Sequence, residues 1–191
     1  MTQPDIHSWY DLDYLARGNL RQRAAYQVLD ELQVMQVLAQ FNPTLVGTLP
    51  IGIDIPGSDL DIICDTDDLN AFSIIVKNKY GEHEDFHLKI KTIHHLPAAI
   101  ASFSYKEFPI QIFAQPCPVE QQNAFRHMVV EARLLEIGGL KARQEIHQLK
   151  LRGLKTEPAF AHYFQLTGNP YARLLELSML SNEDLIKALH P

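Results

Sequence analysis

The chain has 191 residues, of which 46% are hydrophobic and 21% charged, and its formal net charge at pH 7 is −6. This is the composition of a globular protein that can bury a real core, as one domain or as one domain with a helical extension. A general nucleic-acid binder is usually basic, because phosphate contacts supply most of its affinity. The acidic balance therefore argues against extended binding along a nucleic acid and leaves room only for a local basic groove.

Neither the cysteines nor the apolar segments indicate a secreted or membrane protein. Cys64 lies in an apolar run and Cys117 is far from it, so no disulfide framework or zinc site is predicted. Residues 1–5 lack the charged and then apolar pattern of a targeting signal, and no run reaches the roughly 18 apolar residues of a membrane span. These features predict a cytoplasmic protein without a membrane partner.

The first predicted element is a long amphipathic helix over residues 19–40, where apolar side chains recur at helical spacing. It ends at Asn42-Pro43, because the residue before a proline is biased away from helical backbone. A short β-prone segment follows at residues 44–46.

A stretch rich in glycine and proline then leads to a second strand. Charged and apolar residues alternate over residues 59–65, which is the pattern of a strand with two different faces. Residues 69–80 predict a helix that begins after Asp67-Asp68 and closes at Gly81.

Three more strands are predicted before the character of the chain changes. Residues 86–93 alternate, and two further strands at residues 103–105 and 108–113 form a hairpin turned at Lys106-Glu107.

From residue 118 onward the pattern is helical. Helices are predicted over residues 119–137, 140–151, 157–166, 171–177 and 182–189, with glycine-containing breaks between them. The fold class is therefore α+β, with an α/β core over residues 1–117 and a helical C-terminal region over residues 118–191. No flexible linker separates the two, so we expect them to pack together.

The segment with the clearest chemistry contains two aspartates and a glycine-threonine pair. Asp59 and Asp61 are at i and i+2 of one strand, so their carboxylates point the same way, with Cα atoms roughly 6.6 Å apart. They can share a Mg²⁺ ion whose other positions are filled by water and substrate phosphates. Gly47 lets a phosphate approach the backbone closely, and the Thr48 hydroxyl can donate to it. Ser58, in the same run as the acids, is a further phosphate-binding candidate.

An Asp-x-Asp pair alone also fits a solvated strand face, but the complete segment is more specific. It resembles the signature of the DNA polymerase β-like nucleotidyltransferase superfamily, in which Gly-Ser or Gly-Thr is followed by a spacer and then by Asp-x-Asp. Here the spacer is residues 49–58. The predicted order of helix, two strands, helix and further strands is also similar to the core of that fold.

Nearly the whole chain, including residues 153–161 and 168–171, resembles an uncharacterised bacterial family placed in that superfamily. The resemblance implies transfer of a nucleoside monophosphate from an NTP to a hydroxyl or phosphate of an unknown small-molecule or protein acceptor. Asp59 and Asp61 would hold Mg²⁺, which orients the triphosphate and neutralises charge during in-line displacement.

The chain departs from the superfamily pattern at the third acidic position. That pattern places another carboxylate on a later strand, and here the outward polar residue of the strand at 108–113 is Gln111. An amide carries no charge and is no strong base, so a second metal and the acceptor hydroxyl would be served less well. Either Glu107 or another acid substitutes, or catalysis is weak or absent.

Other polar residues have both a functional and a structural interpretation. His87, Lys89 and Lys91 share one strand face and could meet the triphosphate, or could simply be solvated. His94-His95, placed in a loop, lack a third metal ligand at sensible spacing.

Two basic residues of the helical half are further phosphate-binding candidates. Arg126 could bind phosphate in a bidentate manner, or form a surface ion pair with Glu131 or Glu120. Lys155 lies just before a helix predicted to start with Thr156 as its N-cap, and could extend a phosphate-binding edge.

Three functions fit these features. The first is a metal-dependent nucleotidyltransferase. The second is a catalytically silent nucleotide-binding or interaction module on the same fold, favoured by Gln111. The third is an antitoxin-like enzyme that modifies a partner protein, for which the acidic charge would suit a basic partner.

Overall fold

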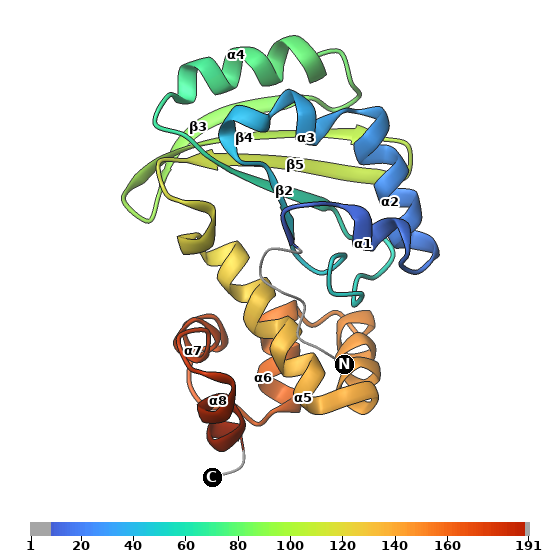
Figure 1. Ribbon diagram of the computed structural model, residues 1–191, viewed down its shortest axis with the longest axis vertical. Coiled ribbons are helices and arrows are strands. Elements are labelled where there is room, and N and C mark those ends of the chain that lie inside the picture. Colours follow the sequence, from blue (N-terminus) through green and yellow to red (C-terminus); the bar gives the residue numbers. More distant parts are fainter. Residues whose placement is uncertain (1–8, 190–191) are drawn as a thin grey trace. The chain divides into compact units, whose positions relative to one another are not determined.

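The computed structural model describes residues 9–189, so the N-terminal segment in which no targeting signal was found lies outside the described residues. The chain forms two compact units (Figure 1). The first comprises the residues up to 52 together with 57–122, and the second comprises residues 53–56 together with those from 123 onward. The division after residue 117 expected from the sequence differs in two places. Residues 118–122 group with the first unit, and the short segment 53–56 groups with the helical one.

The first unit contains all the strands in the described part of the chain. In chain order its elements are α1 (Asp13–Ala16), α2 (Leu20–Glu31), α3 (Val34–Val37), η2 (Ala39–Phe41), β1 (Thr44–Val46), β2 (Leu60–Asp65), α4 (Leu69–Tyr80), β3 (His87–Ile93), β4 (Leu96–Tyr105), β5 (Phe108–Gln115) and η3 (Val119–Gln121). The sheet order is β1-β2-β5-β4-β3. Strands β2 and β5 are parallel and the other neighbours antiparallel, so this is a mixed sheet flanked by helices, as the α+β prediction expected.

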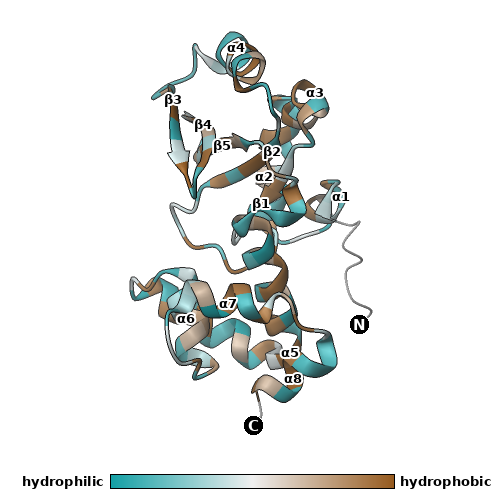
Figure 2. Cartoon of the chain, turned by 90° about the vertical axis from the view of Figure 1, so that its left-hand side faces the viewer, coloured by the Kyte–Doolittle hydropathy of each residue, from teal (hydrophilic) through white to brown (hydrophobic). Residues whose placement is uncertain are grey.

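The two faces of this sheet have different roles. Helices α2, α3 and α4 cover one face (Figure 1), and alternate residues of the strands point into the core there. The buried strand residues of this core are Leu60, Ile62, Cys64, Ala99, Ala101, Phe103, Phe108, Ile110, Ile112 and Ala114. The strands that supply them are strongly hydrophobic (brown in Figure 2). Because side chains alternate along a strand, Asp61 and its register partners lie on the other face.

The long helix predicted over residues 19–40 is wrong in one respect. It breaks at Gln33, whose φ of 55° is left-handed, and α3 begins after that break. Contacts from α4 hold the break: Tyr80 Oη donates to the carbonyl of Leu32, and Lys79 Nζ donates to Gln33 Oε1. Tertiary hydrogen bonds therefore override the helical periodicity of the sequence.

Strand β4 is longer than predicted because it begins at Leu96. Its first half is rich in alanine, which is a weak strand signal, yet it pairs along its length with β3. His94 and His95 form the two-residue turn between these strands, both with positive φ. The predicted hairpin at Lys106-Glu107 is confirmed by the pairing of Tyr105 with Phe108.

The second unit is helical. Its elements are α5 (Asn123–Leu151), α6 (Thr156–Tyr163), α7 (Pro170–Leu177) and α8 (Asn182–Leu189). Non-helical backbone at Gly139 kinks α5 in the predicted glycine break. Helix α5 starts later than expected, since Val119–Gln121 is a 3-10 turn, and the N-cap of α6 is Lys155 rather than Thr156. Among residues 9–189, no helix combines the length and the apolar character that a membrane crossing requires.

Candidate functional site

The end of β1 brings Gly47 directly against Asp61. Val46 pairs with Asp61 across the antiparallel β1–β2 contact, so Gly47 is the next residue along the edge of the sheet. Its φ is +86°, and a Cβ atom placed there would lie 3.1 Å from Oδ2 of Asp61. Both the backbone conformation and this close approach require glycine. A backbone corner without a side chain therefore adjoins the carboxylate, as the phosphate-binding prediction needs.

Side chains of α2 fasten the loop that runs from this corner to the aspartates. Gln22 Nε2 donates to the carbonyls of Leu49 (2.9 Å) and Pro50 (3.2 Å) at the start of the loop. Arg21 Nη2 donates to the carbonyl of Ser58 (3.1 Å) at its end, and the guanidinium stacks 4.6 Å from the centre of the Phe108 ring. Helix α2 thus holds both ends of the loop, including the residue directly before Asp59.

The two aspartates occupy different environments. Asp59 is exposed just before β2, whereas Asp61 is half-buried within the strand. Burial raises the pKa of Asp61 to about 7, the negative charge of Asp59 raises it further, and the hydrogen bond from Gln111 partly opposes the change. The ionised form of Asp61 is therefore unfavourable at neutral pH, and a nearby cation would stabilise it.

Gln111 lies directly opposite Asp61 in the parallel β2–β5 pair. Its Nε2 donates a hydrogen bond to Oδ1 of Asp61 at 3.3 Å. The position that faces the aspartates from the neighbouring strand thus carries an amide. Glu107 does not replace it, because it lies exposed in the β4–β5 turn, four residues and about 13 Å along the strand.

The donor set at this corner fits a magnesium ion that is shared with a substrate. Among residues 9–189, no group of three or more His, Cys, Asp or Glu side chains is arranged to hold a metal ion. A pair of carboxylates with open positions is, however, the arrangement in which Mg²⁺ keeps several waters and binds substrate phosphates. The raised pKa of Asp61 and the missing side chain at Gly47 both favour such an occupant.

The basic residues of β3 share the face of Asp61 but lie three strands away. His87 is opposite Ser102, which is opposite Gln111 in turn, so one row crosses the sheet from Asp61 to His87. Lys89 follows two residues later on the same face. At about 4.8 Å per strand, β3 lies roughly 14 Å from β2. The lysines predicted to meet the triphosphate are thus far from a metal held by the aspartates.

The remaining phosphate-binding candidates belong to the helical unit and have structural partners there. Arg126 Nη2 donates to the carbonyl of Leu175 and to Ser178 Oγ, each at 3.0 Å, which ties α5 to the end of α7. The alternative of an ion pair with Glu131 is wrong, because Glu131 is buried in α5 on another side. The proposed site therefore does not include Arg126. Lys155 is exposed and makes no side-chain cap to α6.

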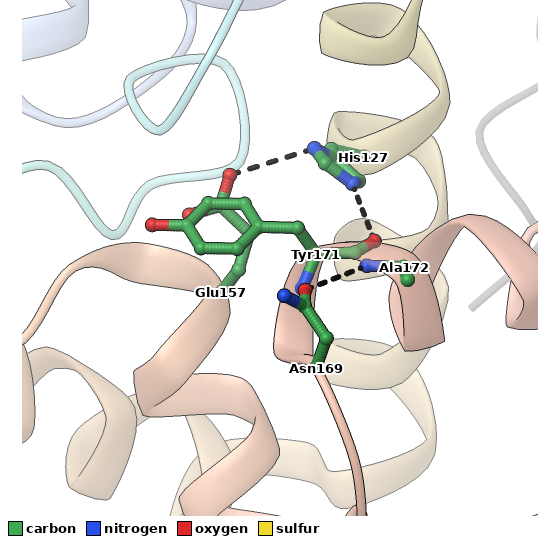
Figure 3. A network of polar contacts seen from close by, with 5 residues as sticks. All are labelled: His127, Glu157, Asn169, Tyr171 and Ala172. Carbon is green, nitrogen blue, oxygen red and sulfur yellow. Dashed lines mark hydrogen bonds and ion pairs between the residues drawn. The ribbon is translucent and has the colours of Figure 1, made fainter.

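A polar network in the same unit was not predicted from the sequence (Figure 3). His127 Nδ1 lies 3.4 Å from Oε1 of Glu157 in α6, and its Nε2 contacts the carbonyl of Tyr171 at 3.1 Å. Asn169 caps α7 by accepting from the backbone amides of Tyr171 and Ala172. The local i, i+4 spacing pointed to Glu131 as the partner of His127, whereas the actual partner comes from another helix. The network joins α5, α6 and α7, which is a structural role.

Comparison with known families decides where the chain belongs. The model of a domain of unknown function, DUF4269, matches residues 27–177, which is more than half of the chain. The chain belongs to the DUF4269 family. No curated protein matches the DUF4269 chain significantly.

Several solved structures share the fold of the DUF4269 chain. The Cid1 poly(U) polymerase with bound MgGTP has a TM-score of 0.52 and 13% identity over 81% of this chain and 48% of its own. A cytoplasmic RNA terminal U-transferase has a TM-score of 0.51 and 14% identity over 87% of this chain and 51% of its own. The GLD-2/RNP-8 complex has a TM-score of 0.52 and 14% identity over 91% of this chain and 73% of its own.

These matches confirm the nucleotidyltransferase-like fold. At 13–14% identity they show the fold alone. The DUF4269 chain spans about half the length of the Cid1 and U-transferase chains.

Proposed function

We propose that this chain is a metal-dependent nucleotidyltransferase that moves a nucleoside monophosphate from an NTP to an acceptor. The observation that carries the proposal is the corner at which Gly47 meets Asp61, with Asp59 two residues away. In this proposal Asp59 and Asp61 hold Mg²⁺. The Gly47 backbone and the hydroxyls of Thr48 and Ser58 bind the phosphates.

The reaction is an in-line displacement at the α-phosphorus of the NTP. An oxygen of the acceptor forms a bond to this phosphorus while the bond to the pyrophosphate leaving group breaks. When bound, Mg²⁺ would supply electrostatic stabilisation of the charge on the phosphates. The chain itself orients the groups: α2 fixes the loop before Asp59, and the Gln111 amide holds the carboxylate of Asp61.

Thermal unfolding tests the nucleotide-binding step without knowledge of the acceptor. Mg²⁺ with a non-hydrolysable NTP analogue should raise the Tm of the wild type, since a ligand at 100 times its Kd stabilises a fold by about 2.7 kcal/mol. Asp59→Asn should remove most of this rise. Asp67→Asn, an exposed aspartate in the turn after β2, is the matched control and should keep it. Absence of a shift with all four NTP analogues counts against the proposal.

A catalytically silent nucleotide-binding module is the second candidate, because Gln111 occupies the position opposite Asp61. It predicts the same Mg²⁺-dependent rise in Tm but no pyrophosphate release with any acceptor. Steady turnover by the unaltered protein would eliminate it.

A further inference from the structure

The acceptor side of the site has no group that can take a proton. Gln111 faces the position where an acceptor oxygen would approach the α-phosphorus, and its amide nitrogen is already directed at Asp61. An amide is not a base at neutral pH. An acceptor hydroxyl would therefore lack general-base assistance there, whereas an oxygen that is already ionised would not need it.

We infer that the acceptor is a phosphate monoester whose own phosphate oxygen is the nucleophile, an inference that rests on the proposed function. A phosphate monoester carries most of its second negative charge at pH 7, because its second pKa is about 6. One of its oxygens bonds to the α-phosphorus, and the bond from that phosphorus to the pyrophosphate oxygen breaks. The products are a diphosphate that joins acceptor and nucleoside, and pyrophosphate. No proton has to be removed from the acceptor.

The charge of the sheet face agrees with an anionic acceptor. The acids of this face lie on β2, the facing residues Gln111 and Ser102 of β5 and β4 are uncharged, and the cations lie on β3. Residues 86–106 contain no Asp or Glu, although the chain as a whole has a net charge of −6. A phosphate beside Gln111 thus meets no carboxylate on its β4 and β3 side.

The ammonium groups of β3 can reach this position. Strand β3 is two steps, or about 10 Å, from β5, and an extended lysine side chain spans roughly 6 Å. Lys89 lies on the Asp61 face beside His87, and Lys91 follows on the same face. Within residues 9–189, neither lysine forms an ion pair or a side-chain hydrogen bond, whereas Lys106 pairs with Glu31 at 2.7 Å. Their charges are thus available to an incoming phosphate.

A simple phosphate monoester tests the binding step. Phenyl phosphate is titrated into isotope-labelled protein, with and without Mg²⁺ and an NTP analogue, and amide chemical shifts are followed by NMR. Shifts are expected at Gln111, Ser102 and the β3 residues. Lys89→Gln/Lys91→Gln should weaken binding about tenfold. The control Lys77→Gln/Lys79→Gln, which removes two exposed lysines from the last turn of α4, should leave it unchanged. Absence of binding, or binding that is indifferent to Lys89 and Lys91, overturns the inference.

The chemistry is tested by comparing acceptors with and without the phosphate. With Mg²⁺ and NTP, phenyl phosphate should yield pyrophosphate and a mixed diphosphate, identified by ³¹P NMR and mass spectrometry, whereas phenol should yield neither. Gln111→Glu should reverse this preference, since a carboxylate repels the phosphate and supplies a base for the hydroxyl. Turnover with phenol and none with phenyl phosphate in the wild type contradicts the inference.

Two further arms separate the failure modes and the sources of the phosphate. If the analogue does not raise the Tm but phenyl phosphate still binds at Gln111 and β3, the nucleotidyltransferase proposal fails and the anion site stands. If the reverse holds, only the anion site fails. A 5′-phosphorylated oligonucleotide that binds at least tenfold more tightly than phenyl phosphate would identify a nucleic-acid end as the source. Equal or weaker binding would identify a small molecule.

Discussion

The amide nitrogen of Gln111 lies 3.3 Å from Oδ1 of Asp61, across the parallel contact between β2 and β5. This hydrogen bond stabilises the ionised carboxylate, while burial and the charge of Asp59 oppose ionisation. The balance between these effects determines how the site responds to pH, to Mg²⁺ and to substitution.

Gln111→Glu should make the folded protein dependent on Mg²⁺ for its full stability. The variant loses a donor to Asp61 and gains a second carboxylate beside it, which should cost on the order of 1–3 kcal/mol in EDTA at pH 8. Millimolar Mg²⁺ should restore more stability to the variant than to the wild type, as measured by urea unfolding. Gln111→Ala is the control, because it removes the hydrogen bond without adding charge. Equal Mg²⁺ effects on the two variants would argue against a metal at this position.

Asp61→Asn should stabilise the metal-free protein in a pH-dependent way. The pKa of Asp61 is raised from 3.8 to about 7 in the folded state, so the folded protein binds this proton more tightly than the unfolded chain does. Stability is therefore greatest below about pH 4 and is lost as the pH rises to about 7. The variant cannot ionise, so its advantage over the wild type should grow across this window to about 1–3 kcal/mol. Thermal melts in EDTA at pH 4 to 8 measure it. A constant difference in Tm would show that the carboxylate ionises normally.

Gly47→Ala should cost more than a strained backbone alone. Gly57 provides the matched comparison, since its φ of +85° nearly equals the +86° of Gly47, but a Cβ there meets nothing within 4 Å. Gly57→Ala should cost about 1 kcal/mol. Gly47→Ala adds a contact at 3.1 Å with Asp61 Oδ2 and should also abolish the rise in Tm with Mg²⁺ and the NTP analogue. Equal costs and equal ligand responses would dissociate Gly47 from the site.

Arg126→Gln should lower stability without affecting nucleotide binding. The change removes the bonds from the guanidinium to the Leu175 carbonyl and Ser178 Oγ, which are worth about 1–3 kcal/mol together. Urea unfolding should report this loss, and the rise in Tm with the NTP analogue should persist. Unchanged stability combined with a lost ligand response would return Arg126 to the phosphate site.

The sequence predicted those parts of the fold that local patterns determine. Alternation identified β2 and β5, so the expectation that Gln111 faces the aspartates needed only the strand order of the resembled superfamily. The break at Gln33 could not be predicted, because hydrogen bonds from Tyr80 and Lys79, distant in sequence, maintain it.

Properties that depend on non-local pairing were likewise hidden. Strand β4 has an alanine-rich first half whose pairing with β3 comes from the tertiary structure. The separation of Lys89 from Asp61 follows from the sheet order, which places β5 and β4 between them. The contact of His127 with Glu157 joins residues on different helices.

Electron paramagnetic resonance of Mn²⁺, used in place of Mg²⁺, tests the central claim most directly. In the presence of a non-hydrolysable NTP analogue, the wild-type protein should bind one Mn²⁺ whose spectrum shows coupling to the phosphorus nuclei of the triphosphate. Asp59→Asn and Asp61→Asn should each weaken this binding at least tenfold, and Asp67→Asn should not. A Mn²⁺–nucleotide complex that binds equally well to all four proteins would contradict the account.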